Sequence, residues 1–176
     1  MPETATLDDS RRVRPHVTVA WAAPRAKLLL LGDRSGLEQL LPHPLATELP
    51  PNSSVRAEAL GVCLWLGPDR RLLLLSHGVS SQSFRKRSTG GAWALDVGAR
   101  YVEFELAGAQ AAAVLNTGCS LDLRTAAFAV GQCAQSRFDQ VPIVIYRSAP
   151  DRFEILTERP LASYLWRWLC RAVDEV

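Results

Sequence analysis

Four cysteines and three histidines are the side chains in this sequence best suited to bind a metal ion or to act as nucleophiles. They are Cys63, Cys119, Cys133 and Cys170, together with His16, His43 and His77. The cysteines form no Cys-x-x-Cys pair, and no histidine stands at ligand spacing from another histidine or from a cysteine. This spacing favours buried, reduced thiols over a zinc site. His77 could face a pocket after an expected strand, but a lone loop histidine most often lies on the surface.

Two sets of carboxylates could do acid–base chemistry. Asp122 lies between two leucines, Leu121 and Leu123, where it could be a ligand or a group with a shifted pKa, although capping the next turn is the favoured role. Glu103 and Glu105 are two residues apart on an expected strand, which places them about 7 Å apart on one face. Glycosidase acid pairs have related geometry, but two solvent-facing glutamates are far commoner.

The chain lacks the common motifs for nucleotide or acyl chemistry. It contains no glycine-rich dinucleotide fingerprint, no phosphate-binding loop and no Gly-x-Ser-x-Gly nucleophile elbow. A Ser–His–Asp arrangement of residues distant in sequence stays open at this level. The sequence therefore predicts no catalytic, no cofactor-binding and no metal-binding residue in this chain.

Charge and hydropathy argue against nucleic acid and membrane partners. The formal net charge is +2, and the basic run Arg85-Lys86-Arg87 lies in the polar segment 78–91 with only Phe84 nearby. A nucleic-acid surface would need more charge and interleaved aromatic residues, so we interpret the segment as a solvated loop or the exposed end of a short helix. The longest aliphatic runs, 28–31 and 72–75, are far shorter than the roughly 20 residues that span a bilayer. With no secretory signal recognisable, we expect a cytoplasmic protein.

The length of 176 residues suits one domain. We expect an N-terminal arm at residues 1–20, either disordered or docked on a partner, because its first part is polar and lacks periodicity. Residues 21–176 then form one domain, either undivided or made of two small lobes at about 21–90 and 91–176.

Hydrophobic periodicity predicts short strands and a few helices. Strands are expected at 26–31, 62–66, 72–75, 93–97, 101–106, 132–138, 143–146 and 153–156, and helices at 37–41, 108–115 and 160–173. A turn at 67–70 should join two strands into a hairpin. In 101–106, Val102, Phe104 and Leu106 share one face. Because the elements do not alternate as βαβ units, the fold class is α+β, with largely antiparallel sheets and flanking helices.

The last helix and one glycine carry more specific expectations. The apolar positions of the helix repeat at helical spacing: Leu161, Tyr164, Leu165, Trp168, Leu169 and Ala172. Trp166 falls toward the opposite side, which suggests another packed lobe or a partner surface. Gly118 is expected to end the helix at 108–115 in a left-handed conformation.

Several separated motifs together resemble one family. They are Thr117-Gly118-Cys119-Ser120-Leu121-Asp122-Leu123, Gly131-Gln132-Cys133-Ala134-Gln135-Ser136-Arg137 and Val141-Pro142-Ile143-Val144-Ile145-Tyr146, with Leu64-Trp65-Leu66-Gly67-Pro68-Asp69, Phe153-Glu154-Ile155-Leu156 and Tyr164-Leu165-Trp166-Arg167-Trp168-Leu169. In this order they resemble the gamma subunit of heterotetrameric sarcosine oxidase over most of residues 60–173. The resemblance implies a fold similar to part of the folate-binding aminomethyltransferases.

The resemblance also implies a role in a complex. Such a complex demethylates sarcosine oxidatively to glycine, with formation of hydrogen peroxide and 5,10-methylenetetrahydrofolate. It implies a large alpha subunit, a beta subunit and a small delta subunit as partners. FAD, FMN, NAD and tetrahydrofolate would belong to these partner subunits, and this chain would hold no cofactor.

Three hypotheses follow from these observations. The leading one is a small, non-catalytic subunit of sarcosine oxidase that buttresses a folate-binding domain of its large partner. A close alternative is the small subunit of a related N-methyl amino acid dehydrogenase. The alternative from another class is a stand-alone module that binds folate or another small ligand, in which Asp122, Arg137 and Trp65 would line a pocket.

Overall fold

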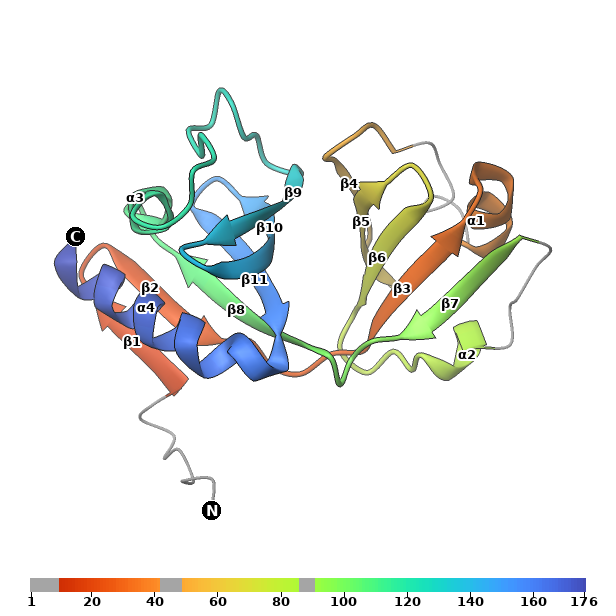
Figure 1. Ribbon diagram of the computed structural model, residues 1–176, viewed down its shortest axis with the longest axis horizontal. Helices are drawn as coiled ribbons and strands as arrows, with labels where there is room; N and C mark the ends of the chain where they lie inside the picture. Colours follow the sequence, from red (N-terminus) through yellow and green to blue (C-terminus); the bar gives the residue numbers. More distant parts are fainter. Residues whose placement is uncertain (1–9, 42–48, 86–90) are drawn as a thin grey trace, which may run out of the picture. The chain divides into compact units, whose positions relative to one another are not determined.

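The computed structural model describes residues 10–41, 49–85 and 91–176, and the chain forms two compact units (Figure 1). The six-stranded unit comprises Met1–Ala23, Val102–Val130 and Gln135–Val176. The five-stranded unit comprises Pro24–Tyr101 and Gly131–Ala134. This division differs from consecutive lobes at about 21–90 and 91–176, because the chain returns to the five-stranded unit for residues 131–134 after it has left it at residue 101.

The expected arm at 1–20 is wrong for its second half. Strands β1 (Arg11–Arg14) and β2 (Val17–Trp21) pair antiparallel there, and β2 pairs in turn with β8 (Tyr101–Ala107). Val17 and Val19 are buried in the sheet, as their spacing of two residues requires. The arginines of β1 concealed this hairpin, because a polar edge strand resembles an unstructured segment in sequence. Residues 1–9 lie outside the described residues.

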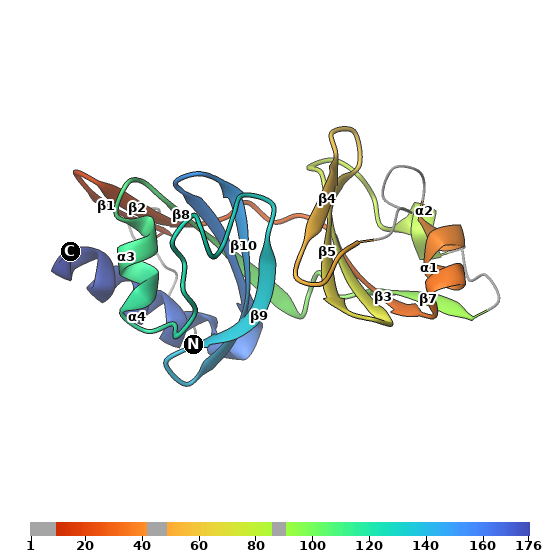
Figure 2. The ribbon, with the colours of Figure 1, turned by 90° about the horizontal axis from the view of Figure 1, so that it is seen from above.

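The six-stranded sheet has the order β1-β2-β8-β11-β10-β9. Its remaining strands are β9 (Cys133–Phe138), β10 (Val141–Ala149) and β11 (Arg152–Glu158), of which β10 and β11 form an antiparallel pair. Helix α3 (Ala111–Asn116) and helix α4 (Ala162–Glu175) contact each other, and α4 lies against β1 and β2 (Figure 2). A 3₁₀ turn at Arg159–Leu161, with Pro160 in its first turn, leads into α4.

The five-stranded sheet has the order β4-β5-β6-β3-β7. Its strands are β3 (Lys27–Gly32), β4 (Ser54–Ala57), β5 (Gly61–Gly67), β6 (Arg70–Leu75) and β7 (Ala92–Asp96), and neighbouring strands pair antiparallel. Helices α1 (Arg34–Leu40) and α2 (Gln82–Arg85) flank β3 and β7. The hairpin around 67–70 is present as predicted, and the fold class is confirmed.

One face of the five-stranded sheet packs on these helices around a leucine-rich core. Leu28 and Leu30 of β3 point into this core with Leu37 and Leu40 of α1. The side chain of Asp33 caps α1, because its Oδ1 accepts a hydrogen bond from the backbone N–H of Gly36 at 2.7 Å.

Gly118 does not act as a left-handed helix stop. The cap of α3, Thr117, keeps right-handed helical angles, and Gly118 has no positive φ. A Cβ atom at Gly118 would instead lie 2.8 Å from Cε1 of Phe138, a fully buried ring. Close packing of this ring therefore explains the glycine, and backbone conformation does not.

A buried arginine holds the long segment between α3 and β9. Arg147, on β10, is only 4% exposed. Its Nη1 donates to the carbonyl oxygens of Leu123 (3.1 Å) and Phe128 (2.7 Å), and its Nη2 donates to Thr125 Oγ1 (3.0 Å). Its Nε and Nη2 both donate to the carbonyl oxygen of Pro150. One side chain thus replaces the backbone hydrogen bonds that this irregular segment cannot make with itself.

Within the described ranges, no helix is long and apolar enough to cross a lipid bilayer.

Candidate functional site

Helix α4 presents one face to its sheet and another to solvent. The buried residues of the helix follow helical spacing and are Ala162, Leu165, Leu169, Ala172 and Val173. Tyr164 and Leu161, which we expected on the apolar face, are 38% and 36% exposed. The buried stripe is therefore rotated from the predicted one toward Ala162 and Val173.

Trp166 packs inside its own unit, which corrects the expected opposite orientation. Its ring is stacked on Phe104, with the centroids 5.8 Å apart and the planes at 14°, and its centroid lies 5.8 Å from that of Trp21. Trp21 and Phe104 meet edge to face at 4.6 Å. Trp166 follows Leu165 by only 100° around the helix, so it borders the buried stripe and can reach β2 and β8.

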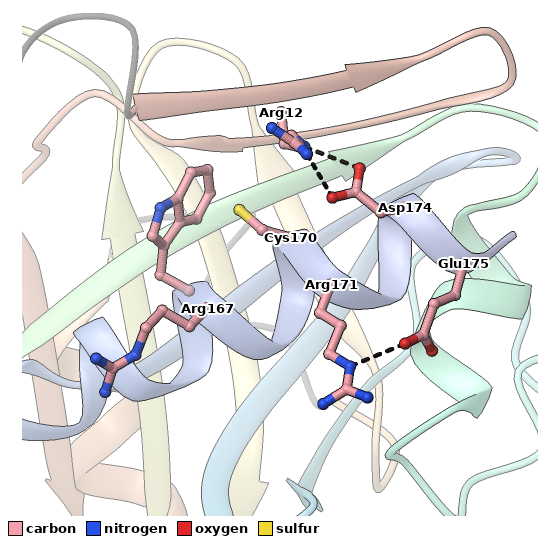
Figure 3. Close-up of a pocket in the computed structure, with 7 residues that line it drawn as sticks. Arg12, Arg167, Cys170, Arg171, Asp174 and Glu175 are labelled. Atoms are coloured by element: carbon pink, nitrogen blue, oxygen red, sulfur yellow. Dashed lines mark hydrogen bonds and ion pairs between the residues drawn. The ribbon is translucent and has the colours of Figure 1, made fainter.

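An open groove of about 450 Å³ lies between β1 and α4 (Figure 3). Its lining residues are Arg12, Trp166, Arg167, Cys170, Arg171, Asp174 and Glu175. Asp174 joins the two elements, because it accepts hydrogen bonds from Arg12 Nε at 2.8 Å and Arg12 Nη2 at 2.5 Å, and pairs with Arg14 Nη2 at 2.5 Å. The hydrogen bond from Arg12 lowers the pKa of Asp174. This carboxylate is therefore the ionised partner of two arginines and not an acid–base group.

A second, smaller groove of about 230 Å³ lies on the solvent side of α4 and shares two arginines with the first. Its lining residues are Tyr164, Arg167, Trp168 and Arg171. The hydroxyl of Tyr164 donates to Asp139 Oδ2 at 2.7 Å, which raises the pKa of Tyr164. Arg171 lies over the Trp168 ring at 5.7 Å and pairs with Glu175 at 2.8 Å. Arginine and aromatic side chains suit contacts with another protein.

Asp122 takes the capping role that we favoured. Its Oδ1 accepts from the backbone N–H of Arg124 at 3.1 Å, and its carboxylate pairs with the Arg124 guanidinium at 2.5 Å. The hydrogen bonds from the Arg124 side chain and backbone lower the pKa of Asp122 to about 2. A carboxylate that stays ionised down to this pH cannot serve as a proton donor near neutrality.

The pair of glutamates on β8, Glu103 and Glu105, differs from the predicted solvent-facing pair. Glu105 is partly exposed and pairs with Arg152 at 3.6 Å, but Glu103 is only 5% exposed. We expected both to face solvent, and this is wrong for Glu103. The strand that carries it, β8, lies between β2 and β11 inside the sheet, so side chains of both neighbouring strands flank Glu103.

The remaining residues of the proposed ligand pocket have partners close in sequence. Arg137 Nη2 donates to the carbonyl oxygen of Gln140 at 2.9 Å, and Arg71 lies 5.9 Å from the Trp65 ring centroid. Trp65 belongs to the five-stranded unit, whereas Asp122 and Arg137 belong to the six-stranded unit. Neither groove along α4 includes any of the three.

The histidines and the basic run form no cluster in the part of the chain that the structure describes. His16, in the turn between β1 and β2, and His77 are exposed, as expected of loop histidines. His43 and the basic residues Lys86 and Arg87 lie outside the described residues, as does the side chain of Arg85. The described residues contain no group of three His, Cys, Asp or Glu side chains that could hold a metal ion.

The four cysteines are thiols and differ in environment. Burial raises the pKa of Cys63 to about 12 and that of Cys133 to about 11, and the Cys133 Sγ donates to the carbonyl oxygens of Ser53 and Trp65 at 3.3 Å. Cys170 is only partly buried and lines the groove beside β1 (Figure 3). These environments predict very different reactivities.

We expect Cys170 to be alkylated first when the native chain is treated with iodoacetamide at pH 8. Cys63 and Cys133 should react at least about 100-fold more slowly, since the thiolate is the nucleophile and both access and ionisation are suppressed. Peptide mass spectrometry after timed quenching measures the three rates. Cys170→Ser should remove the fast phase, and rapid labelling of Cys63 in folded protein would contradict the buried environment.

Comparison with solved structures defines the class of fold. The heterotetrameric sarcosine oxidase from Corynebacterium sp. U-96 contains a chain that superposes with a TM-score of 0.80 at 22% identity, over 94% of this chain and 88% of that chain. The glycine cleavage system aminomethyltransferase T from Bartonella henselae superposes with a TM-score of 0.66 at 23% identity, over 92% of this chain and 46% of that chain. The fold is therefore of the aminomethyltransferase type, as predicted.

The model of the sarcosine oxidase gamma subunit family matches residues 36–175, and the chain belongs to this family. It is 28% identical over 145 residues to the sarcosine oxidase subunit gamma of Corynebacterium sp. (strain P-1), covering 80% of this chain and 71% of that protein. It is also 28% identical over 114 residues to the subunit gamma of Arthrobacter sp., covering 64% of this chain and 56% of that protein. The predicted family is confirmed, and the match begins before residue 60, where the resemblance in sequence began.

Proposed function

We propose that this chain is a structural subunit of a heterotetrameric sarcosine oxidase, assembled with alpha, beta and delta subunits in the cytoplasm. The observation that carries the proposal is the family match over residues 36–175. The likeness to a chain of a heterotetrameric sarcosine oxidase over 94% of this chain supports it. In the proposed complex, sarcosine, dioxygen and tetrahydrofolate give glycine, hydrogen peroxide and 5,10-methylenetetrahydrofolate.

The charged side chains of the six-stranded unit support a structural role, because they hold its elements together. Arg147 binds the backbone of the segment before β9, and Asp174 joins α4 to β1. Asp122 is held by Arg124. We therefore place catalysis, with FAD, FMN, NAD and tetrahydrofolate, in the partner subunits.

The aminomethyltransferase-type fold raises the question of a folate site in this chain. A pterin ring presents neighbouring N–H groups, which could donate hydrogen bonds to a carboxylate that points into a cavity. The candidate carboxylate, Asp122, is exposed and already bound by Arg124, and Arg137 is bound by Gln140. These residues do not fit a folate.

Co-expression tests the proposed function. The chain is produced with the alpha, beta and delta subunits of its own organism, and the alpha subunit carries the affinity tag. We expect a yellow complex that contains this chain and consumes oxygen with sarcosine. Parallel assays with dimethylglycine and N-methylglutamate distinguish sarcosine oxidase from a related dehydrogenase.

The matched control is the same co-expression without this chain. We expect that preparation to be less stable to heat and to lose oxygen consumption. Full activity and stability without the chain would overturn the structural role. Oxidation of sarcosine by the isolated, colourless chain would overturn the assignment of catalysis to the partners.

A further inference from the structure

An apolar patch lies at the end of the five-stranded sheet. Trp93 and Leu95 are two residues apart on β7, so they share one face of this edge strand, and they are 58% and 48% exposed. The register of β3 and β7 places Leu31 opposite Trp93 and Leu29 opposite Leu95. Both leucines are partly exposed. We call these four side chains the β3–β7 face.

This face is turned away from the core of its unit. Leu28 and Leu30 of β3 point to the opposite side, where they pack with α1. Because strand side chains alternate, Leu29 and Leu31 cannot contribute to that core. The sequence thus places leucines on both sides of β3. The helices of the five-stranded unit cover one side; on the other side Leu72, opposite Leu29, is fully buried, and the part that is exposed lies at β7.

Strand β7 carries little charge for the edge of a sheet. The edge strand β1 carries Arg11, Arg12 and Arg14, which oppose pairing with other chains. Strand β7 is apolar from Ala92 to Leu95 and ends at Asp96, whose Oδ2 accepts from Ser81 Oγ at 2.6 Å. An exposed tryptophan in an edge strand that is apolar over four residues marks an interaction surface.

The available area argues against a second copy as the occupant. A tryptophan offers about 150–250 Å² when fully buried, so the exposed parts of the four side chains amount to roughly 300 Å². Two copies meeting through this face would bury on the order of 600 Å², about half of what a stable interface needs. A larger chain, whose contact continues past the edge of the sheet, has no such limit.

We propose that the β3–β7 face is covered by an uncharged, apolar surface of the large subunit of the oxidase, with Trp93 as its anchor. This inference rests on the proposed function, because it names the surface through which the chain joins the complex. An exposed tryptophan in an apolar patch has the character of an interface hot spot, whereas the grooves along α4 are rich in charge.

The test uses the complete complex purified through a tag on the alpha subunit. The amount of this chain recovered per flavin is measured for the wild type, Trp93→Ala, Trp93→Glu and Leu95→Glu. We expect less Trp93→Ala to be recovered per flavin, because truncation of a hot-spot residue weakens binding by about 30-fold, and we expect the glutamate variants to be lost from the complex. Val13→Glu is the matched control, because Val13 is 52% exposed on β1, an edge strand of the six-stranded sheet.

Two further measurements keep the outcomes distinct. Circular dichroism of each full-length variant shows whether it folds, and hydrogen exchange of residues 92–96 in the wild-type chain is compared between the free chain and the complex. We expect slower exchange of these amides in the complex. This second readout needs no substitution and therefore stands even where a variant fails to fold.

Each experimental result leads to one conclusion. If the wild-type chain does not co-purify, the proposed function fails. If the wild type co-purifies and folded Trp93→Glu does so equally, or β7 exchanges at the same rate in both states, the β3–β7 face is not the interface. Equal loss of Val13→Glu would also overturn the assignment to this face. Concentration-dependent dimers of the free chain, abolished by Trp93→Glu while the variant still joins the complex, would assign the face to a second copy.

Discussion

Replacement of Arg147 by methionine is expected to lower the free energy of unfolding by about 3–5 kcal/mol. Methionine has similar length but no donor, so the carbonyl oxygens of Leu123, Phe128 and Pro150 lose their partners. The guanidinium also lies 5.0 Å from the ring centroid of buried Phe153, and that contact is lost as well. Urea denaturation of the full chain, followed by circular dichroism, measures the change.

The matched control is Arg152→Met on the neighbouring strand. Arg152 is exposed, and its pair with Glu105 at 3.6 Å should contribute less than about 1 kcal/mol. Arg147→Lys should recover only part of the stability, because an ammonium lacks the planar fork that reaches several carbonyls at once. Equal midpoints for Arg147→Met and Arg152→Met would show that the buried guanidinium does not hold this segment.

Elements whose signal is local could be predicted from the sequence. The aliphatic runs at 26–31 and 72–75 became β3 and β6, and the hairpin turn at 67–70 was found from its glycine, proline and aspartate. The period of two in 101–106 identified β8, with Val102, Phe104 and Leu106 buried. In each case the side chains that decide the structure are neighbours in the chain.

Features that depend on distant contacts could not be predicted. The hairpin of β1 and β2 becomes a strand pair only because β2 adds to β8, some eighty residues later. Position 118 requires a glycine because the ring of Phe138 packs against it. Trp166 points inward because its ring packs on those of Trp21 and Phe104. No periodicity within the segments themselves records these partners.

The same reason limits what the sequence says about the candidate site. The ion pair of Arg12 and Asp174 joins residues that are 162 positions apart, so the sequence around either residue gave no sign of a groove. In the sequence, Arg147 directly follows an apolar run and resembles the exposed end of a strand. In the structure its side chain is buried and donates five hydrogen bonds. The one visible signal for the β3–β7 face is the leucine run 28–31, which places leucines on both sides of β3.

Replacement of Gly61 by alanine is expected to destabilise the five-stranded unit by about 3–5 kcal/mol. Gly61 has a φ of +136° at the start of β5, where it pairs with Leu75. A Cβ atom there would lie 2.0 Å from the carbonyl oxygen of Leu74 and 2.9 Å from the Cα of Leu75. Both are backbone atoms of the paired strand β6, so neither can move aside without breaking the ladder.

Two glycines of the same unit separate the two components of this effect. Gly78 has a φ of +83° and nothing within 4 Å of an added Cβ, so Gly78→Ala should cost only the backbone strain of about 1–2 kcal/mol. Gly67, at the other end of β5, has no positive φ and its nearest contact would be 3.6 Å, so Gly67→Ala should change stability by less than about 1 kcal/mol. The urea midpoint should therefore be highest for Gly67→Ala, lower for Gly78→Ala and lowest for Gly61→Ala. Were Gly61→Ala as stable as Gly78→Ala, the close approach of β5 and β6 would not be what requires glycine here.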